Sequence, residues 1–267
     1  MKKHLVYIIV FIGILTSSCS GYDKLLKSND TELKYKEAMN YYEKGKYMKA
    51  YSLLENVATH YKGTSKSEHV LFMIAESYRK NEDYITAYNY YQTYTKTFPN
   101  GPSVDDCYFY CGICYYELSP DPRLDQTDTK KAIEEFELYL DLFPNGKHVL
   151  EVNEKIAELT DKLVKKEYLS SKLYYNLGNY LGNNYLSAIV TAESVLMKYP
   201  NTTYKEDLMI LILRSKYEQA KHSVEEKRKQ RFIETIDEYY HFRSEFPNSK
   251  YTKEVEKIFN HATQVVK

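Results

Sequence analysis

Three cysteines near the middle of the chain have a spacing that could support redox chemistry. Cys107, Cys111 and Cys114 follow the pattern C-x3-C-x2-C, which also occurs among cysteines that hold an iron–sulfur cluster. One hypothesis is therefore an enzyme that uses this trio. A second possibility is a disulfide between two of the three, which an oxidising compartment would permit.

The residues around these cysteines favour a structural role instead. Cluster-binding cysteines of the radical SAM type lie on a loop after a barrel strand, whereas the segment VDDCYFYCGICYYEL has the pattern of a helix with Cys111 on its core side. Thiols four residues apart on one helix also fit disulfide geometry poorly. Because buried cysteine commonly acts as a small hydrophobic residue, we expect three structural thiols.

The rest of the sequence contains few groups arranged for chemistry. The seven histidines are scattered and show no HExxH or other metal-ligand spacing. GxSxG, P-loop and GxGxxG motifs are missing from the sequence. Basic and acidic residues number 37 each, which gives no electrostatic reason to expect a nucleic-acid partner. We therefore expect no catalytic residues, no metal and no cofactor, and a protein that is not an enzyme.

The first residues resemble a bacterial lipoprotein signal. Two lysines precede an uncharged apolar run at residues 5–15, which is too short to span a bilayer as a helix, and small residues then lead to Cys19. We expect residues 1–18 to be a lipoprotein signal peptide that is removed. Cys19 would then carry an N-terminal lipid, and residues 19–29 would form a lipidated linker. The alternative is an ordinary secretory peptide in which the cysteine is incidental.

The residue after this cysteine indicates a location. Ser20, not an aspartate, follows Cys19, and by resemblance to lipoprotein sorting rules this favours the outer membrane. We expect the protein to lie at the periplasmic face of that membrane and to contact it through its lipid anchor.

One layout recurs five times along the rest of the chain. Each copy has a small residue, ten further residues and an aromatic residue, which Pro-Asn usually follows. Since proline disfavours helix in the residue before it, each Pro-Asn predicts the end of a helix. The five pairs are Ala50 and Tyr61, Ala87 and Phe98, Ala132 and Phe143, Ala188 and Tyr199, and Thr235 and Phe246.

The pattern between these stops is helical and resembles the tetratricopeptide repeat, a helix-turn-helix unit of about 34 residues. We expect an all-α fold, an α-solenoid of about five such repeats. Residues 30–145 would hold repeats 1 to 3, and residues 146–267 a long helix with repeats 4 and 5. Residues 119–126 contain two prolines and predict an inserted loop. Residues 148–177 lack Pro and Gly and predict one long helix.

The 30 tyrosines indicate a surface for extended peptides, since a tyrosine offers a large apolar ring with a polar end. In tetratricopeptide arrays the first helix of each unit lines the concave face. The alternative for any single residue is a partly exposed ring that belongs to the core. Counting repeat positions gives eight candidate peptide-groove residues: Tyr35, Met39, Tyr42, Phe72, Glu76, Arg79, Phe109 and Tyr116.

The lipoprotein signal, the five repeats and two long segments together resemble the BamD family, the lipoproteins of the outer-membrane β-barrel assembly machine (the BAM complex). The two segments are residues 119–148 and residues 162–202. The resemblance implies a periplasmic adaptor that aids the recognition, folding and insertion of outer-membrane β-barrel proteins. The alternative is another periplasmic repeat lipoprotein, an adaptor for cell-wall synthesis or for secretion.

The same resemblance implies two classes of partner. The C-terminal half would bind the periplasmic domains of a BamA-like barrel insertase. The N-terminal half would recognise C-terminal segments of unfolded outer-membrane proteins. Such segments end in aromatic residues, so a groove lined by Tyr35, Tyr42, Phe72 and Phe109 would suit them.

Overall fold

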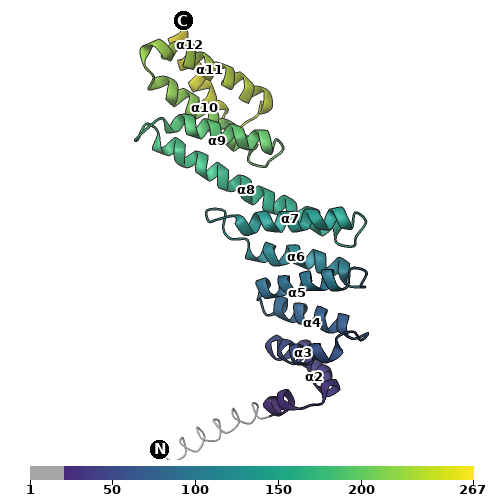
Figure 1. Ribbon diagram of the computed structural model, residues 1–267. Helices are drawn as coiled ribbons and strands as arrows, with labels where there is room; N and C mark the ends of the chain where they lie inside the picture. Colours follow the sequence, from purple (N-terminus) through teal and green to yellow (C-terminus); the bar gives the residue numbers. More distant parts are fainter. Residues whose placement is uncertain (1–20) are drawn as a thin grey trace, which may run out of the picture. The chain divides into compact units, whose positions relative to one another are not determined.

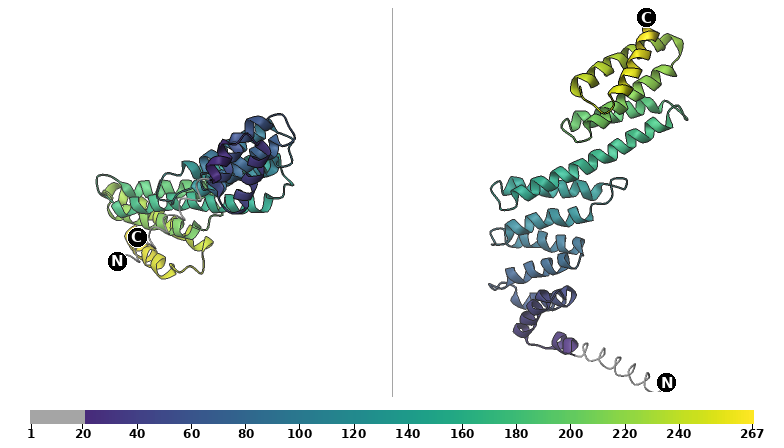
Figure 2. Two further views of the ribbon diagram at one scale, coloured as in Figure 1. Left: turned by 90° about the horizontal axis from the view of Figure 1, so that it is seen from below. Right: turned by 180° about the vertical axis from the view of Figure 1, so that it is seen from behind.

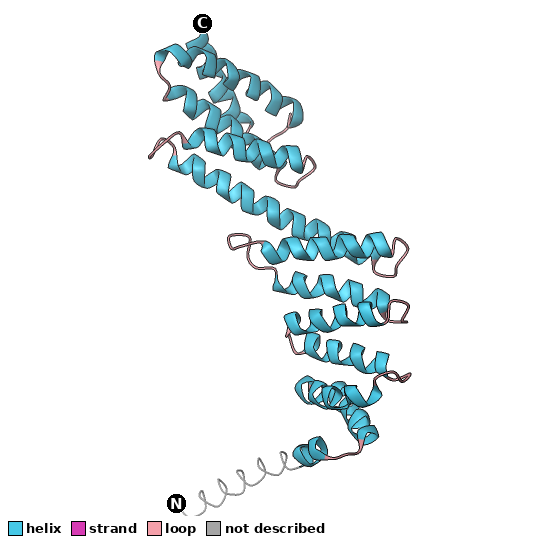
Figure 3. Cartoon of the chain, in the orientation of Figure 1, coloured by secondary structure: helices cyan, strands magenta, loops and turns pink. Residues whose placement is uncertain are grey.

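The computed structural model describes residues 21–267, and within this range the chain forms helices, turns and loops but no strand (Figures 1 and 3). The fold is all-α, as the sequence pattern predicts. Residues 21–27 are helical and precede the labelled helices. These are α2 (Thr31–Glu43), α3 (Tyr47–Tyr61), α4 (Ser67–Lys80), α5 (Tyr84–Thr97), α6 (Val104–Leu118), α7 (Thr127–Leu142), α8 (Val149–Leu177), α9 (Asn184–Lys198), α10 (Lys205–Lys221), α11 (Glu225–Glu245) and α12 (Thr252–Val266).

The chain divides into two compact units, each of which is described by itself. Unit 1 holds the chain up to Ser119 together with Thr127–Asn153, and unit 2 holds Pro120–Gln126 together with Glu154–Lys267. The division therefore falls within α8, a few residues after the boundary drawn from the repeats, and the loop with two prolines groups with unit 2.

Unit 1 is a stack of helical hairpins. Helices α2 to α7 follow one another in chain order, and each packs against the helix before it (Figures 1 and 2). Asp30 and Asp83 cap α2 and α5, because their carboxylates accept hydrogen bonds from the backbone N–H groups of Leu33 and Thr86. Local capping and the hairpin turns thus set where these helices begin and end.

The recurring sequence layout marks how the helices pack. Three of its aromatic residues, Phe98, Tyr199 and Phe246, lie directly at helix C-termini, where the following proline stops the helix. Large residues at the small positions would push neighbouring helices apart. The small residues are all 0% exposed: Ala50, Ala87, Ala132, Ala188 and Thr235.

The cysteine trio lies in the core of unit 1. All three thiols are on α6, free and buried, in an apolar cluster that includes Ala75, Ala87, Tyr91 and Tyr94. On the same helix, a Cβ atom added at Gly112 would overlap the Phe136 ring of α7. The trio therefore sits on a tightly packed helix and not on a loop, as expected of structural thiols.

Unit 2 contains most of the long helix and four shorter ones. Helix α8 has 29 residues, which confirms the helix expected over residues 148–177. Its Ser171 hydroxyl donates a hydrogen bond to the Ala188 carbonyl of α9 at 2.8 Å. Three apolar clusters then fill the space among α8 to α12, centred on Ala192, Met209 and Phe232.

Two sequence predictions concern the membrane. The signal peptide over residues 1–18 and the lipid attachment at Cys19 lie outside the described residues. Among residues 21–267, none of the helices combines the length and the apolar character needed to cross a bilayer.

Candidate protein-binding site

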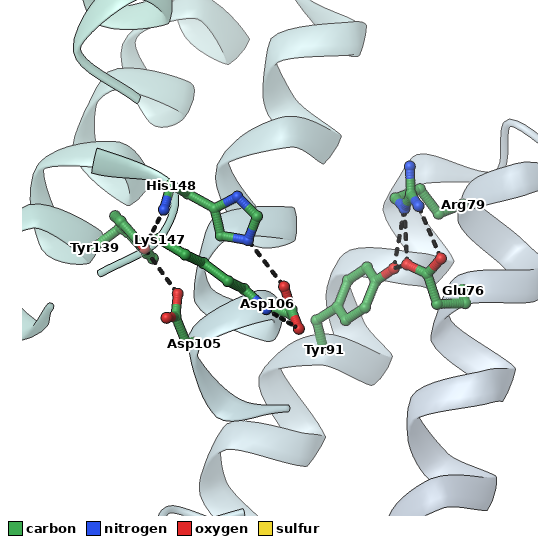
Figure 4. A network of polar contacts seen from close by, with 8 residues as sticks. All are labelled: Glu76, Arg79, Tyr91, Asp105, Asp106, Tyr139, Lys147 and His148. Carbon is green, nitrogen blue, oxygen red and sulfur yellow. Dashed lines mark hydrogen bonds and ion pairs between the residues drawn. The ribbon is translucent and has the colours of Figure 1, made fainter. Parts of the chain in front are cut away.

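A buried ion pair on α4 organises the first-helix side of unit 1 (Figure 4). The Arg79 Nε and Nη2 atoms donate hydrogen bonds to the Glu76 carboxylate at 2.9 Å and 2.8 Å. The Tyr91 hydroxyl from α5 donates to the same carboxylate, and the Tyr42 hydroxyl from α2 donates to it at 3.3 Å. Glu76 is only 6% exposed, so these donors replace the water that its charge would otherwise require.

The electrostatics of this cluster keep its tyrosine hydroxyls protonated and its guanidinium charged. Burial, followed by the adjacent Glu76 carboxylate, raises the pKa of Tyr91 and that of Tyr42, so both hydroxyls remain protonated donors. Burial opposes the charged form of Arg79, but its hydrogen bonds with Glu76 outweigh burial and raise the pKa of Arg79. The cluster therefore keeps protonated hydroxyl donors and a charged guanidinium over the whole physiological pH range.

Arg79 also connects α4 to the next repeat. Its guanidinium carbon lies 4.1 Å from the centre of the Tyr110 ring of α6, which is within the range of a cation–π contact. Its hydrogen bonds to Glu76 and Tyr91 occupy Nε and Nη2, and Figure 4 shows the remaining nitrogen, Nη1, pointing away from Glu76. A guanidinium held in this way can donate to a carbonyl or carboxylate oxygen of a ligand.

A second cluster lies where α6 meets the start of α8 (Figure 4). The His148 ring stacks on Phe109 at 3.8 Å with an interplanar angle of 6°, and its Nε2 atom is 2.8 Å from Asp106. Lys147 donates a hydrogen bond to the other Asp106 oxygen at 2.7 Å. Burial opposes ionisation of Asp106, but the hydrogen bonds from Lys147 and His148 outweigh it and lower the pKa of this carboxyl.

These contacts form a row of polar and aromatic side chains that we call the first-helix ladder. It runs over successive first helices of unit 1, and the His148 ring at its end lies 6.4 Å from the ring of Tyr110. Rings with fixed hydrogen-bond donors between them suit an extended peptide, which offers apolar side chains and backbone carbonyls in alternation. Its members are Tyr42, Glu76, Arg79, Tyr110 and His148.

The structure brings three of the eight candidate groove residues into direct contact, namely Tyr42, Glu76 and Arg79. Phe72 is half-buried, and its ring packs near Tyr91 at 6.3 Å. It thus lies beside the ladder and not within its hydrogen-bond network.

The other four candidates lie elsewhere. Tyr35 donates to or accepts from His69 Nδ1 at 2.8 Å, and Met39 packs against the core of the first repeat. Tyr116 lies half-buried near the end of α6. Phe109 is only 4% exposed because His148 covers it, so its ring is not available to line a groove.

Repeat counting did not identify Tyr91, Tyr110 or His148 as parts of the site. His148 lies five residues after Phe143 and directly before α8, at a position whose residue type the recurring layout does not specify. The pair Asp106 and His148 could have indicated this cluster. Asp106 lies in the first turn of α6, and its carboxylate pairs with the His148 ring directly before α8.

Unit 2 has a separate apolar cleft of about 350 Å³. Leu196 and Met197 of α9 line it together with Met209 and Ile212 of α10, and Met197 is 85% exposed. Methionine side chains adapt readily to different partner surfaces.

Ion pairs edge this cleft. Lys205 pairs with Glu245 at 2.6 Å, and Lys216 pairs with Glu238 at 2.6 Å. Protein interfaces combine an apolar centre with a polar and charged rim. This cleft has the same arrangement and could therefore accept a segment of another protein.

The sequence of the chain is similar to a family of lipoproteins and to several named proteins. A family model described as "Outer membrane lipoprotein" (YfiO) matches residues 27–182. The chain is 20% identical to a protein of Caulobacter vibrioides named "Outer membrane protein assembly factor BamD" over 76% of this chain and 67% of that protein. It is 24% identical to a protein of the same name from Rickettsia prowazekii, over 68% of this chain and 70% of that one.

A solved structure is also similar. The yeast Sti1 TPR2AB domain in complex with pHSP90 is 13% identical, with a TM-score of 0.41, and the match covers 87% of this chain and 98% of that one.

Proposed function

The chain belongs to the YfiO family of outer membrane lipoproteins, and on this premise we propose that it is an outer membrane protein assembly factor of the BamD type. In this role the protein is a lipoprotein component of the BAM complex at the periplasmic face of the outer membrane. It aids the recognition, folding and insertion of outer-membrane β-barrel proteins, and it does so by binding other proteins.

The match of the family model over more than half of the chain carries this proposal. Relatives from several bacteria with the same assembly-factor name support it over about three quarters of the chain. The helical-repeat architecture fits a binding role, because stacked hairpins present extended surfaces. These observations favour barrel assembly over the alternatives of a cell-wall or secretion adaptor.

The finer part of the proposal assigns clients to unit 1. The first-helix ladder binds the C-terminal segments of unfolded outer-membrane proteins, with Tyr110 and Phe72 contacting aromatic side chains of the client. Arg79 Nη1 donates to a carbonyl or to the terminal carboxylate. The fixed Glu76–Arg79 pair supports this assignment, since it holds the guanidinium in place before a ligand arrives.

The proposal assigns binding of the insertase to unit 2. The cleft edged by the Lys205–Glu245 and Lys216–Glu238 pairs takes a segment from the periplasmic domains of a BamA-like insertase, with Met197 as a central apolar contact. The exposure of Met197 and the apolar cleft floor support this placement.

A peptide-binding experiment tests the client site. A labelled peptide with the last residues of an outer-membrane barrel protein is titrated with the protein, and binding is read from fluorescence anisotropy. Tyr110→Leu, and separately the combined Tyr42→Ala and Phe72→Ala, should each weaken binding about tenfold. Tyr240→Leu is the matched control, because Tyr240 is 58% exposed in unit 2. Unchanged binding in both test variants would contradict the ladder as client site.

A co-purification experiment tests the insertase site. The protein is recovered from solubilised outer membranes, and the amount of insertase that accompanies it is measured. Met197→Glu should reduce that amount, because it places a charge in the apolar cleft. Met48→Glu is the matched control on unit 1, where Met48 is 61% exposed. Equal recovery from the two variants would place the insertase contact outside this cleft.

A further inference from the structure

The loop between α8 and α9 presents apolar side chains to solvent on an ordered backbone. Leu181 is 91% exposed and Tyr180 is 68% exposed. The loop is closed by a hydrogen bond from Asn184 N to the Gly178 carbonyl at 2.9 Å, and the Asn184 side chain donates to the Tyr180 carbonyl at 2.7 Å. The two exposed side chains therefore project from a fixed turn.

The backbone of this loop is unusual for a leucine. Leu181 has a φ angle of 52°, in the left-handed region that β-carbons disfavour and that glycine or asparagine normally occupies. Gly178 and Gly182, on either side, also have positive φ angles. A glycine or asparagine at position 181 would relieve the strain, so folding alone does not explain an exposed leucine there.

The surrounding sequence is almost free of charge. Residues 168–192 contain one charged side chain, Lys172, and no carboxylate, although 28% of the whole chain is charged. Additional exposed apolar residues flank the loop, among them Leu173, Leu177 and Leu186, which are 57%, 39% and 49% exposed. Apolar tips with tyrosine and without carboxylates are typical of segments that enter the headgroup region of a bilayer.

We propose that this loop inserts Tyr180 and Leu181 into the interfacial region of a phospholipid bilayer, as a second membrane contact of a protein whose family is lipidated. A protein surface fits this loop less well than a bilayer does. A stable protein interface buries about 800 Å² on each side and has a rim of polar and charged groups. Two protruding side chains on a charge-free hairpin suit a lipid surface, where each buried side chain contributes independently.

The sequence offers a clean reporter, because it contains no tryptophan. The full-length lipoprotein with Tyr180→Trp is reconstituted into vesicles of phosphatidylethanolamine and phosphatidylglycerol, with and without brominated acyl chains. Met48→Trp is the matched control, because Met48 on α3 of unit 1 is 61% exposed. We expect a blue-shifted emission and strong bromine quenching for Tyr180→Trp, and neither for Met48→Trp.

A second variant separates membrane contact from folding. Leu181→Asn added to Tyr180→Trp keeps a residue that accepts the left-handed backbone. It should lower the equilibrium between inserted and free loop by about tenfold, because a buried leucine side chain is worth at least that much.

Three outcomes would overturn the proposal: emission and quenching of Tyr180→Trp equal to those of Met48→Trp, no effect of Leu181→Asn, or a blue shift that depends on protein concentration without vesicles. The last result would assign the loop to a second copy of this chain. The measurement contains no barrel protein or insertase, so its failure is independent of the assembly function.

Discussion

The Tyr94 hydroxyl occupies the space that a Cβ atom on residue 101 would need, at 2.6 Å from where that atom would be. The same hydroxyl accepts a hydrogen bond from the Ser103 backbone N–H at 3.2 Å and donates one to the Glu68 carboxylate. Tyr94 on α5 thereby joins the starts of α4 and α6, which belong to neighbouring repeats. The glycine is needed because this hydroxyl and the Glu68 carboxylate both approach the turn so closely.

The next repeat contains the same arrangement. The Tyr139 hydroxyl accepts from His148 N at 3.1 Å and donates to Asp105 at 2.7 Å, and a Cβ atom on Gly146 would overlap it. Each tyrosine precedes its glycine by seven residues. In the other three repeats that position has no hydroxyl and the glycine is replaced: Val57 with Thr64, Val195 with Thr202, and Phe242 with Ser249.

Gly101→Ala should lower the free energy of unfolding by about 1–3 kcal/mol, because the new methyl group displaces a buried ring. Tyr94→Phe removes the hydroxyl and should cost about 1 kcal/mol through its lost hydrogen bonds. In the double variant the hydroxyl is gone, and the Glu68 carboxylate, which also lies against the new methyl group, loses this donor and can move away. The loss should therefore be smaller than the sum of the two single losses. Urea unfolding measures all three, and strictly additive losses would show that the two residues are not coupled.

The two ion pairs Glu76–Arg79 and Glu32–Lys66 should differ greatly in importance. The Glu76 and Arg79 side chains are 8% and 15% exposed, whereas those of Glu32 and Lys66 are 65% and 41% exposed. Glu76→Ala leaves a poorly solvated cation and should cost about 3 kcal/mol or more. Glu32→Ala should cost less than about 1 kcal/mol. Thermal or urea unfolding of both variants checks the contrast, and equal losses would argue against a desolvated Glu76.

The three core cysteines should be unreactive in the folded protein. Burial raises the pKa of Cys114 to about 12 and raises the pKa values of Cys107 and Cys111 as well. The thiolate is the reactive form, so iodoacetamide at pH 8 should label none of the three until urea unfolds unit 1. Mass spectrometry counts the labelled sites. Rapid labelling of the native protein, or bound iron with a visible absorption band, would revive the redox hypothesis.

The cluster around Asp106 should lose its contribution to stability in acid. The pKa of Asp106 is lower in the folded protein than its ordinary value of 3.8, so ionised Asp106 stabilises the fold above about pH 4. This contribution disappears as the pH falls through the folded pKa. It should be below about 1 kcal/mol, because the Lys147 side chain is 57% exposed.

Urea unfolding from pH 7 down to pH 3 checks this sign. The difference in unfolding free energy between the unaltered protein and Asp106→Asn should shrink as the pH falls. A difference that stays constant over this range would mean that the Asp106 carboxylate gains nothing from Lys147 and His148.

Most of the fold was predictable from the sequence because its signals are local. The eleven-residue layout placed the small residues, all of which are buried, and Pro-Asn placed the helix ends. Residues 148–177 lack helix breakers and form α8 almost to the residue. The division into two units within α8 depends on packing between helices, which a repeat count does not contain.

Less of the candidate site was predictable. Repeat counting identifies equivalent positions, so it found Glu76 and Arg79 together. It does not show how far a side chain reaches into the next repeat. Arg79 contacts the ring of Tyr110, whereas the repeat positions on that helix had indicated Phe109 and Tyr116 as groove residues. Phe109 was expected to be open, but the His148 ring stacks on it, and the recurring layout does not specify the residue type at position 148.

The most direct test of the assembly function is depletion of this protein from its own bacterium, with the barrel proteins of the outer membrane quantified by mass spectrometry. Folded barrel proteins of many kinds should decrease together while outer-membrane lipoproteins remain, because binding by this chain is needed before insertion. A normal complement of folded barrels after depletion would contradict it.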